Sequence, residues 1–208
     1  MKILLADDHS VVRKGLKSIL SEAYPTAIIQ EETDGASILG SLNQQQWNLI
    51  ITDISMPGRS GLEVLKDIKQ ISPQTPVLIL SIHTAEQYAI RALKAGASGY
   101  LTKESAPEEL IKAIQQILNG RKYITAAIAE LMADSFNNAI DKAPHELLSN
   151  REFEVLKLIA SGKTISEIAN SLSLSVNTIS TYRSRILEKM QLNTNAALTK
   201  YAVDYKLV

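Results

Sequence analysis

Ile3-Leu4-Leu5-Ala6-Asp7-Asp8 is a short apolar run that ends in two carboxylates. Similar runs recur through the first 120 residues, and each is too short for a helix. Several are rich in β-branched side chains, so each run predicts a buried strand of a parallel sheet. The other four runs cover residues 27–29, 49–52, 77–80 and 100–101.

Stretches of 12 to 20 residues with helical spacing separate these runs. Leu110, Ile111, Ile114 and Ile117 form one such apolar stripe, and Ser105 and Glu108 ahead of it have the spacing of a capping box. Five strands alternating with five helices predict an α/β fold, a five-stranded doubly wound parallel sheet covered on both faces. Sites in such sheets form beyond the carboxyl ends of the strands, so functional residues should directly follow the apolar runs.

The remainder of the chain has a different pattern. Residues 121–143 are partly Ala-rich and predict a linker that is partly helical, and no strand pattern follows them. We therefore divide the chain into residues 1–120, a linker at 121–143, and a small all-α domain at 144–208. The last domain is expected to have four helices, at residues 150–161, 165–172, 176–191 and 195–205.

Composition excludes several classes of protein. Lys plus Arg and Asp plus Glu each number 22, but residues 1–143 carry a net charge of −2 and residues 144–208 a net charge of +2. Cysteine is absent, which removes disulfides, thiolate catalysis and Cys-type zinc sites. No apolar stretch approaches 18 residues, and the first apolar run is too short for a signal peptide, so we expect a cytoplasmic protein without a membrane span.

Polar residues follow four of the predicted strands. Asp7 and Asp8 follow the first, Asp53 the third and Ser81 the fourth, while the fifth leads to Lys103. Three carboxylates at one edge of a sheet repel one another, and Mg²⁺ would remove that penalty. A carboxylate can also accept a phosphoryl group, whose charge a lysine and a hydroxyl would stabilise. The alternative for each residue alone is ordinary, an N-cap or loop aspartate and a solvated lysine, but their joint placement favours a site.

These residues carry a family resemblance over residues 1 to about 120. Leu4 to His9, Asp53 to Gly61 with Met56-Pro57-Gly58, Ser81, and Lys94 to Lys103 resemble the receiver domain of bacterial response regulators. The resemblance implies a flavodoxin-like fold in which Asp53 is the phosphoacceptor. The implied Mg²⁺ ligands are Asp8, Asp53 and the backbone carbonyl of Ser55, with Asp7 acting through water. Lys103 would pair with the phosphoryl oxygens, Ser81 would be the switch hydroxyl and Tyr100 the switch aromatic.

Three positions qualify this transfer. Lys103 precedes Glu104, whereas a proline often follows the family lysine, and Ser81 stands where many members have threonine. His9 lies beside the acids and could be a ligand or phosphodonor, but we favour a structural or capping role.

A helix-turn-helix pattern occupies the last domain. Ser149 and Glu152 have capping-box spacing, and the small Ala169 would let two helices approach closely. Ser173 stands where many such turns have glycine. The helix after the turn carries polar groups that suit base edges and cations that suit phosphates, although a solvated helix face is the alternative. The predicted DNA-binding residues are Asn177, Thr178, Ser180, Thr181, Arg183, Ser184, Arg185 and Lys189.

This domain resembles the LuxR-type DNA-binding domain through Leu148 to Leu156, Ile165 to Ala169 and Val176 to Ile186. With the receiver, the whole chain is similar to NarL/FixJ-type response regulators. The resemblance implies base contacts from Ser180, Thr181 and Ser184. It also implies a dimer face on the last helix, formed by Ala197, Leu198, Tyr201 and Ala202.

The sequence thus predicts a transcription regulator of a two-component system rather than a dedicated enzyme. A sensor histidine kinase would phosphorylate Asp53 with Mg²⁺, and the phosphorylated chain would form a homodimer on paired half-sites of double-stranded promoter DNA, with RNA polymerase as a further candidate partner. A phosphatase of the aspartyl-phosphate type is a weaker alternative, because such enzymes need a second acid where Ser55 stands. A third reading is a regulator that works through protein contacts without phosphorylation.

Overall fold

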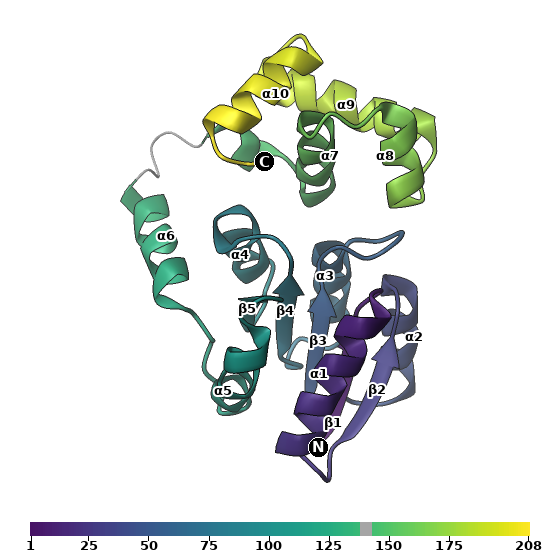
Figure 1. Cartoon of the computed structure of the whole chain (residues 1–208), viewed down its shortest axis with the longest axis vertical. Coiled ribbons are helices and arrows are strands. Elements are labelled where there is room, and N and C mark those ends of the chain that lie inside the picture. Colours follow the sequence, from purple (N-terminus) through teal and green to yellow (C-terminus); the bar gives the residue numbers. More distant parts are fainter. Residues whose placement is uncertain (138–142) are drawn as a thin grey trace. The chain divides into compact units, whose positions relative to one another are not determined.

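The computed structural model describes residues 1–137 and 143–208 of the chain. Figure 1 shows an α/β unit and a helical unit, and the compact units are Met1–Asp134 and Ser135–Val208. Within the described residues, every helix falls short of the length and apolar character needed to cross a membrane. Residues 138–142 of the predicted linker lie outside the described residues.

The first unit contains a five-stranded parallel sheet in the order β2-β1-β3-β4-β5, which confirms the predicted fold class. The strands match the predicted runs closely, except that β2 continues past the apolar residues into Gln30-Glu31-Glu32. This strand is at the edge of the sheet and only partly buried, so polar side chains are tolerated there. The strands are β1 (Lys2–Ala6), β2 (Ile28–Glu32), β3 (Leu49–Asp53), β4 (Val77–Ser81) and β5 (Gly99–Thr102).

Five helices alternate with these strands and cover both faces of the sheet (Figure 1). Leu16 and Leu20 of the first helix pack with Leu110 and Ile114 of the fifth against alternate strand residues. The buried side chains of the other three helices lie outside this cluster, on the opposite face. The helices are α1 (Ser10–Ala23), α2 (Gly35–Gln44), α3 (Gly61–Ile71), α4 (Ala85–Lys94) and α5 (Ala106–Leu118).

Helix α6 (Ala126–Asn137) follows within the predicted linker, so the linker is partly helical. Tyr123, just before it, is buried and forms a backbone bridge with Gly99 of β5. The chain after α5 therefore stays attached to the sheet edge before the helix begins.

After residues 138–142, the described part of the second unit contains the 3₁₀ helix η1 (Pro144–Leu147) and then four helices within one residue of the predicted bounds. The Ser149–Glu152 capping box is present at the start of α7. The one predicted at Ser105–Glu108 is wrong, because the Ser105 hydroxyl bonds to Thr102 and its side chain does not cap α5. The helices are α7 (Asn150–Ala160), α8 (Ile165–Leu172), α9 (Val176–Met190) and α10 (Asn195–Asp204).

Candidate functional site

Three aspartates meet at the carboxyl ends of neighbouring strands. Asp7 and Asp8 follow β1, and Asp53 is the last residue of β3. Strand order reverses between these two strands, since β2 lies beyond β1 and β4 beyond β3. One ligand atom from each aspartate and one from His9 all lie within 4.8 Å of one another. Asp7 and Asp53 are 1% exposed, so their charges need compensation inside the unit.

Lys103 provides that compensation. Its Nζ lies 2.7 Å from Asp53 Oδ2 and 2.7 Å from Asp7 Oδ2. Burial would lower the pKa of Lys103, but its interactions with the two carboxylates together outweigh burial and raise the pKa above its usual value. Burial has the larger effect on Asp53, whose pKa is raised despite the neighbouring ammonium group. The lysine therefore stays charged and bridges the two buried carboxylates.

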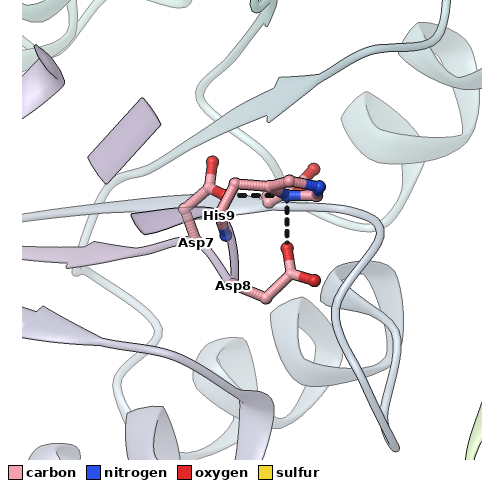
Figure 2. A group of neighbouring side chains, drawn as sticks. Asp7, Asp8 and His9 are labelled. Atoms are coloured by element: carbon pink, nitrogen blue, oxygen red, sulfur yellow. Dashed lines mark hydrogen bonds and ion pairs between the residues drawn. The ribbon is translucent and has the colours of Figure 1, made fainter. Parts of the chain in front are cut away.

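His9 lies over the carboxylates of Asp7 and Asp8 (Figure 2). Its Nδ1 is 2.7 Å from Asp8 Oδ1 and 3.4 Å from Asp7 Oδ1. It occupies the N-cap position of α1, but its side chain does not cap the helix. Instead, its backbone N–H donates to Asp7 Oδ1 at 2.8 Å. His9 therefore stands at the start of the helix, but its imidazole contacts the two aspartates and does not cap the helix.

The remaining predicted residues surround this cluster. The Ser55 N–H donates to Asp53 Oδ1 at 3.2 Å. Ser81 is fully buried, and its Oγ accepts a hydrogen bond from the His83 N–H. The Tyr100 ring is buried, and its hydroxyl donates to the His83 carbonyl at 2.7 Å. Ser81 and Tyr100 therefore converge on the backbone of one residue in the loop after β4.

The loop after Asp53 folds back on the end of β3. The Gly61 N–H donates to the Ile54 carbonyl at 2.8 Å. A Cβ at Gly61 would lie 2.0 Å from the Asp53 carbonyl oxygen, so no other residue fits without a backbone shift. Gly58 in the same loop has φ +77°, a conformation that favours glycine. Gly61 thus lets the backbone pack closely against Asp53, and Gly58 lets the loop turn.

The donor set fits a small hard cation. Three carboxylates converge, and oxygen ligands of this kind suit Mg²⁺. The Asp8 side chain is 28% exposed and, among the described residues, forms an ion pair with His9 alone, so it can turn toward a cation. Asp7 Oδ2 is fully buried and lies at ion-pair distance from Lys103 without well-aligned hydrogen-bond geometry. The cluster therefore has unused acceptor capacity.

Helices α8 and α9 form a helix-turn-helix. Ser173 ends α8 with φ 54°, which explains why glycine is common at this position. Ser175 begins α9, and its Oγ accepts a hydrogen bond from the Thr178 N–H at 3.1 Å. Ala169, predicted to let the two helices approach, is buried, and so is Ile179 of α9. The turn thus presents one face of α9 to solvent.

The structure divides the predicted DNA-binding residues into two groups. The first group is exposed on α9 and comprises Asn177, Ser180, Thr181, Ser184 and Arg185. The second group is engaged with other side chains of the unit, although Lys189 is itself exposed. Thr178 belongs to the cap, Arg183 Nε donates to Asn195 Oδ1 at 2.6 Å, and Lys189 Nζ lies 2.6 Å from Glu152 Oε2. Glu152 is 3% exposed, so Lys189 neutralises a buried charge.

Two hydroxyls on the exposed face are already engaged as donors. Thr181 Oγ1 donates to the Asn177 carbonyl and Ser184 Oγ to the Ser180 carbonyl. Asn177 and Arg185 line one open depression of about 350 Å³ with Thr178, Thr181 and Tyr182. The Asn177 amide and the Arg185 guanidinium group thus offer several N–H donors to an external partner on this face.

The predicted dimer face on α10 needs correction. Leu198 and Ala202 are 0% exposed, because α10 packs against α7, and they are therefore core residues. Ala197 and Tyr201 are half-buried. The Tyr201 hydroxyl also contacts His145 Nδ1 at 2.9 Å, and its ring stacks on Tyr205. The sequence pattern marked an apolar stripe of α10 without distinguishing a core stripe from an interface.

Comparison with known proteins assigns both units. Residues 3–115 match the response regulator receiver domain, and residues 146–202 match the luxR family of bacterial regulatory proteins. The chain is a response regulator with a LuxR-type DNA-binding domain. This family consists of transcription regulators rather than dedicated enzymes.

Relatives of this response regulator align over its whole length. The oxygen regulatory protein NreC of Staphylococcus carnosus is 36% identical, with 100% of this chain and 99% of that protein covered. The response regulator UvrY of Escherichia coli K12 is 31% identical, with coverage of 100% and 95%. Among solved structures, RcsB of Salmonella enterica serovar Typhimurium, bound to promoter P1flhDC in the presence of phosphomimetic BeF₃⁻, has 28% identity, a TM-score of 0.60 and 97% coverage of both chains.

Several contacts in this response regulator could not be read from its motifs. Arg13 of α1 reaches the Asp7 carbonyl, and His83 Nε2 lies 3.3 Å from Ser55 Oγ. Asn195 and Glu152 hold the two basic residues of α9 described above. Each contact joins residues 6 to 37 positions apart, and nothing in the sequence marked any of these four residues as a contact of the site.

Proposed function

We propose that Asp53 accepts a phosphoryl group from a sensor histidine kinase in the presence of Mg²⁺. The observation that carries the proposal is the placement of the Asp53 carboxylate, which is buried at the end of β3 beside two other acids and 2.7 Å from the Lys103 ammonium group. A carboxylate held in this way can act as a nucleophile while a fixed cation waits for the incoming charge.

In the transfer, an Asp53 carboxylate oxygen forms a bond to phosphorus while the phosphorus–nitrogen bond of the kinase phosphohistidine breaks. The electron pair of that bond stays with the imidazole nitrogen. Mg²⁺ would supply positive charge beside the transferred group. Asp7, Asp8, Asp53 and the Ser55 backbone carbonyl would hold it. Lys103 would pair with a phosphoryl oxygen, and the Ser81 hydroxyl would donate to another.

Ser81 and Tyr100 provide a route from the phosphoryl group to the surface of the receiver. Both side chains bond to His83, which follows β4, so a new hydrogen bond at Ser81 would alter the same loop that Tyr100 holds. Phosphorylation would thereby shift an existing equilibrium rather than create a new fold. We propose that the favoured state dimerises and binds paired half-sites in promoter DNA through α9.

Promoter binding by the RcsB relative supports this assignment. Two DNA-binding domains in one dimer gain affinity through their high effective concentration. The dimer would regulate transcription in the cytoplasm, with RNA polymerase as a further partner. We also propose the boundaries 1–120, 121–143 and 144–208 for receiver, linker and DNA-binding domain, which the matched ranges 3–115 and 146–202 support.

The test uses the full chain with a small acyl phosphate and Mg²⁺. Mass spectrometry and DNA binding are followed for the wild type, Asp53→Ala and, as a surface control, Asp67→Ala. We expect one phosphoryl adduct that raises DNA affinity, present in the control and absent in Asp53→Ala. Repeated release of phosphate would support the phosphatase alternative. No adduct, with DNA binding unchanged, would support regulation without phosphorylation.

A further inference from the structure

Arg13 of α1 connects the ends of two strands at the acidic cluster. Its Nη1 donates to the Asp7 backbone carbonyl at 2.6 Å, and its Nε donates to Glu31 Oε2 on β2 at 3.2 Å. The Arg13 side chain is 15% exposed, so its guanidinium group is held between these partners rather than extended into solvent. One side chain therefore fixes the first turn of α1 against β1 and β2.

The carbonyl that Arg13 holds belongs to the peptide bond between Asp7 and Asp8. The orientation of that peptide plane sets the directions of both side chains. The Asp7 carboxylate is also held, by the His9 N–H at Oδ1 and by Lys103 at Oδ2. Among these contacts, the one from Arg13 is the contact that fixes the backbone, and Figure 2 shows how closely the two carboxylates that it orients lie to His9.

We propose that Arg13 is a positioning residue for the cation site, acting through the Asp7–Asp8 peptide without touching the cation. This inference rests on the proposed function, because it assumes that Mg²⁺ binds at Asp7, Asp8 and Asp53. Groups that orient metal ligands change metal affinity by about 10- to 100-fold when they are removed. Glu31 supports the role by holding the other edge of the guanidinium group.

The charge of Arg13 and its positioning role predict opposite changes in Mg²⁺ affinity when the side chain is removed. Its positive charge lies beside an acidic cluster, so removing it would strengthen cation binding if charge alone mattered. If Arg13 orients the two acids, removing it weakens binding. Lys17 is a matched control, because its Nζ pairs with Glu31 Oε1, while its contacts with the described residues do not include Asp7. Lys17→Ala removes one positive charge and one Glu31 ion pair but leaves the Asp7 carbonyl held.

The experiment titrates Mg²⁺ into the full chain by isothermal calorimetry without a phosphodonor. We expect Arg13→Ala to weaken Mg²⁺ binding at least tenfold and Lys17→Ala to leave it within about twofold of the wild type or tighter. Arg13→Lys should lie between, since an ammonium group can reach one of the two acceptors but cannot bridge both as the guanidinium group does. The rate of phosphorylation by an acyl phosphate should fall in Arg13→Ala at low Mg²⁺ and recover at saturating Mg²⁺, which a general loss of structure would not allow.

Mg²⁺ binding by Arg13→Ala that equals or exceeds that of the wild type would overturn the proposal. A wild type that binds no Mg²⁺ and forms no phosphoryl adduct would contradict the proposed function instead, so the two failures are distinguishable. Circular dichroism checks that each variant is folded. If Arg13→Ala is unfolded, Arg13→Lys decides the question, with binding as tight as the wild type counting against a positioning role.

Discussion

Two lysines, one in each unit, show how differently the units treat a buried charge. Lys103 bridges two carboxylates, and its pKa is raised because its interactions with them together outweigh burial. Lys157 of α7 is 9% exposed, and burial lowers its pKa to about 8, since the attraction of Glu154 offsets burial only in part. The receiver gathers opposite charges into one site, whereas the DNA-binding unit carries a buried charge at a net cost. Burial alone therefore does not mark a lysine as part of a functional site; the charged groups around it must be known as well.

The largest effect should follow from removing the lysine of the receiver. Lys103→Met leaves Asp7 and Asp53 buried without their cation, which should destabilise the receiver by about 3 kcal/mol. Mg²⁺ should restore much of this loss by neutralising the same oxygens. Urea unfolding with and without Mg²⁺ measures both effects, with the exposed Lys17→Met as the control. Equal stability of Lys103→Met and the wild type without Mg²⁺ would remove the contrast between the two lysines.

Removing Lys157 is expected to have the opposite effect on stability and to stabilise the protein at neutral pH. Its pKa is about 8 in the folded chain and near 10.5 in the unfolded chain, so between these values the unfolded state binds more protons and stability rises with pH. The slope should reach at most about 1.4 kcal/mol per pH unit. Burial raises the pKa of Tyr201 to about 12, which reverses the trend above pH 10, so the useful window is pH 8 to 10.

Lys157→Met isolates this contribution, because other titrating groups cancel between the two proteins. Calorimetric melting should show the variant more stable than the wild type at pH 7, with the difference shrinking toward pH 10. A difference independent of pH would mean that Lys157 is not the group responsible. Lys157→Met and Lys103→Met together test whether neighbouring charges, rather than burial alone, determine if a buried lysine stabilises or destabilises the fold.

The receiver site was predictable because its residues sit at positions that the sheet itself dictates. Asp7, Asp53, Ser81 and Lys103 each follow an apolar run, and the parallel sheet brings the ends of those runs together. Arg13 was not predictable, because its partner Glu31 lies on an edge strand whose polar residues resemble a loop. A pattern of apolar residues locates strands but not the side-chain contacts between them.

The helices of the second unit were predicted within one residue, but the roles of their side chains were not. Leu198 and Ala202 form part of an apolar stripe, and the sequence does not tell whether such a stripe faces α7 or a second chain. Lys189 reads as a basic residue on the recognition helix, yet its partner Glu152 lies 37 residues away. Periodicity identifies the apolar face of a helix, but what packs against that face depends on the tertiary structure.

A moderate effect on stability should distinguish Lys189 from a phosphate contact. Lys189→Ala leaves the buried Glu152 carboxylate without its cation, and because Lys189 is 40% exposed we expect a loss of about 1–2 kcal/mol. DNA affinity measured on the folded variant should change little. Thermal melting and fluorescence anisotropy with a promoter fragment provide the two readouts. A stable variant with strongly weakened DNA binding would return Lys189 to the DNA-binding surface.

The smallest effect, and the one that isolates the DNA-binding surface, is expected from Arg185. It is exposed on α9, and within the part of the chain that the structure describes no hydrogen bond or ion pair ties it to the protein. Arg185→Ala should therefore leave stability unchanged and reduce the slope of log K against log salt by about one, as expected when one phosphate contact is lost. If Arg185 instead bonds a guanine edge, the slope changes little and discrimination among half-site sequences decreases. Affinity measured at several salt concentrations on two half-site sequences separates these outcomes.

The two α9 variants test whether a charge on one helix stabilises the fold or binds DNA. Lys189→Ala is expected to lower stability with little change in DNA affinity. Arg185→Ala is expected to change DNA binding and leave stability unchanged.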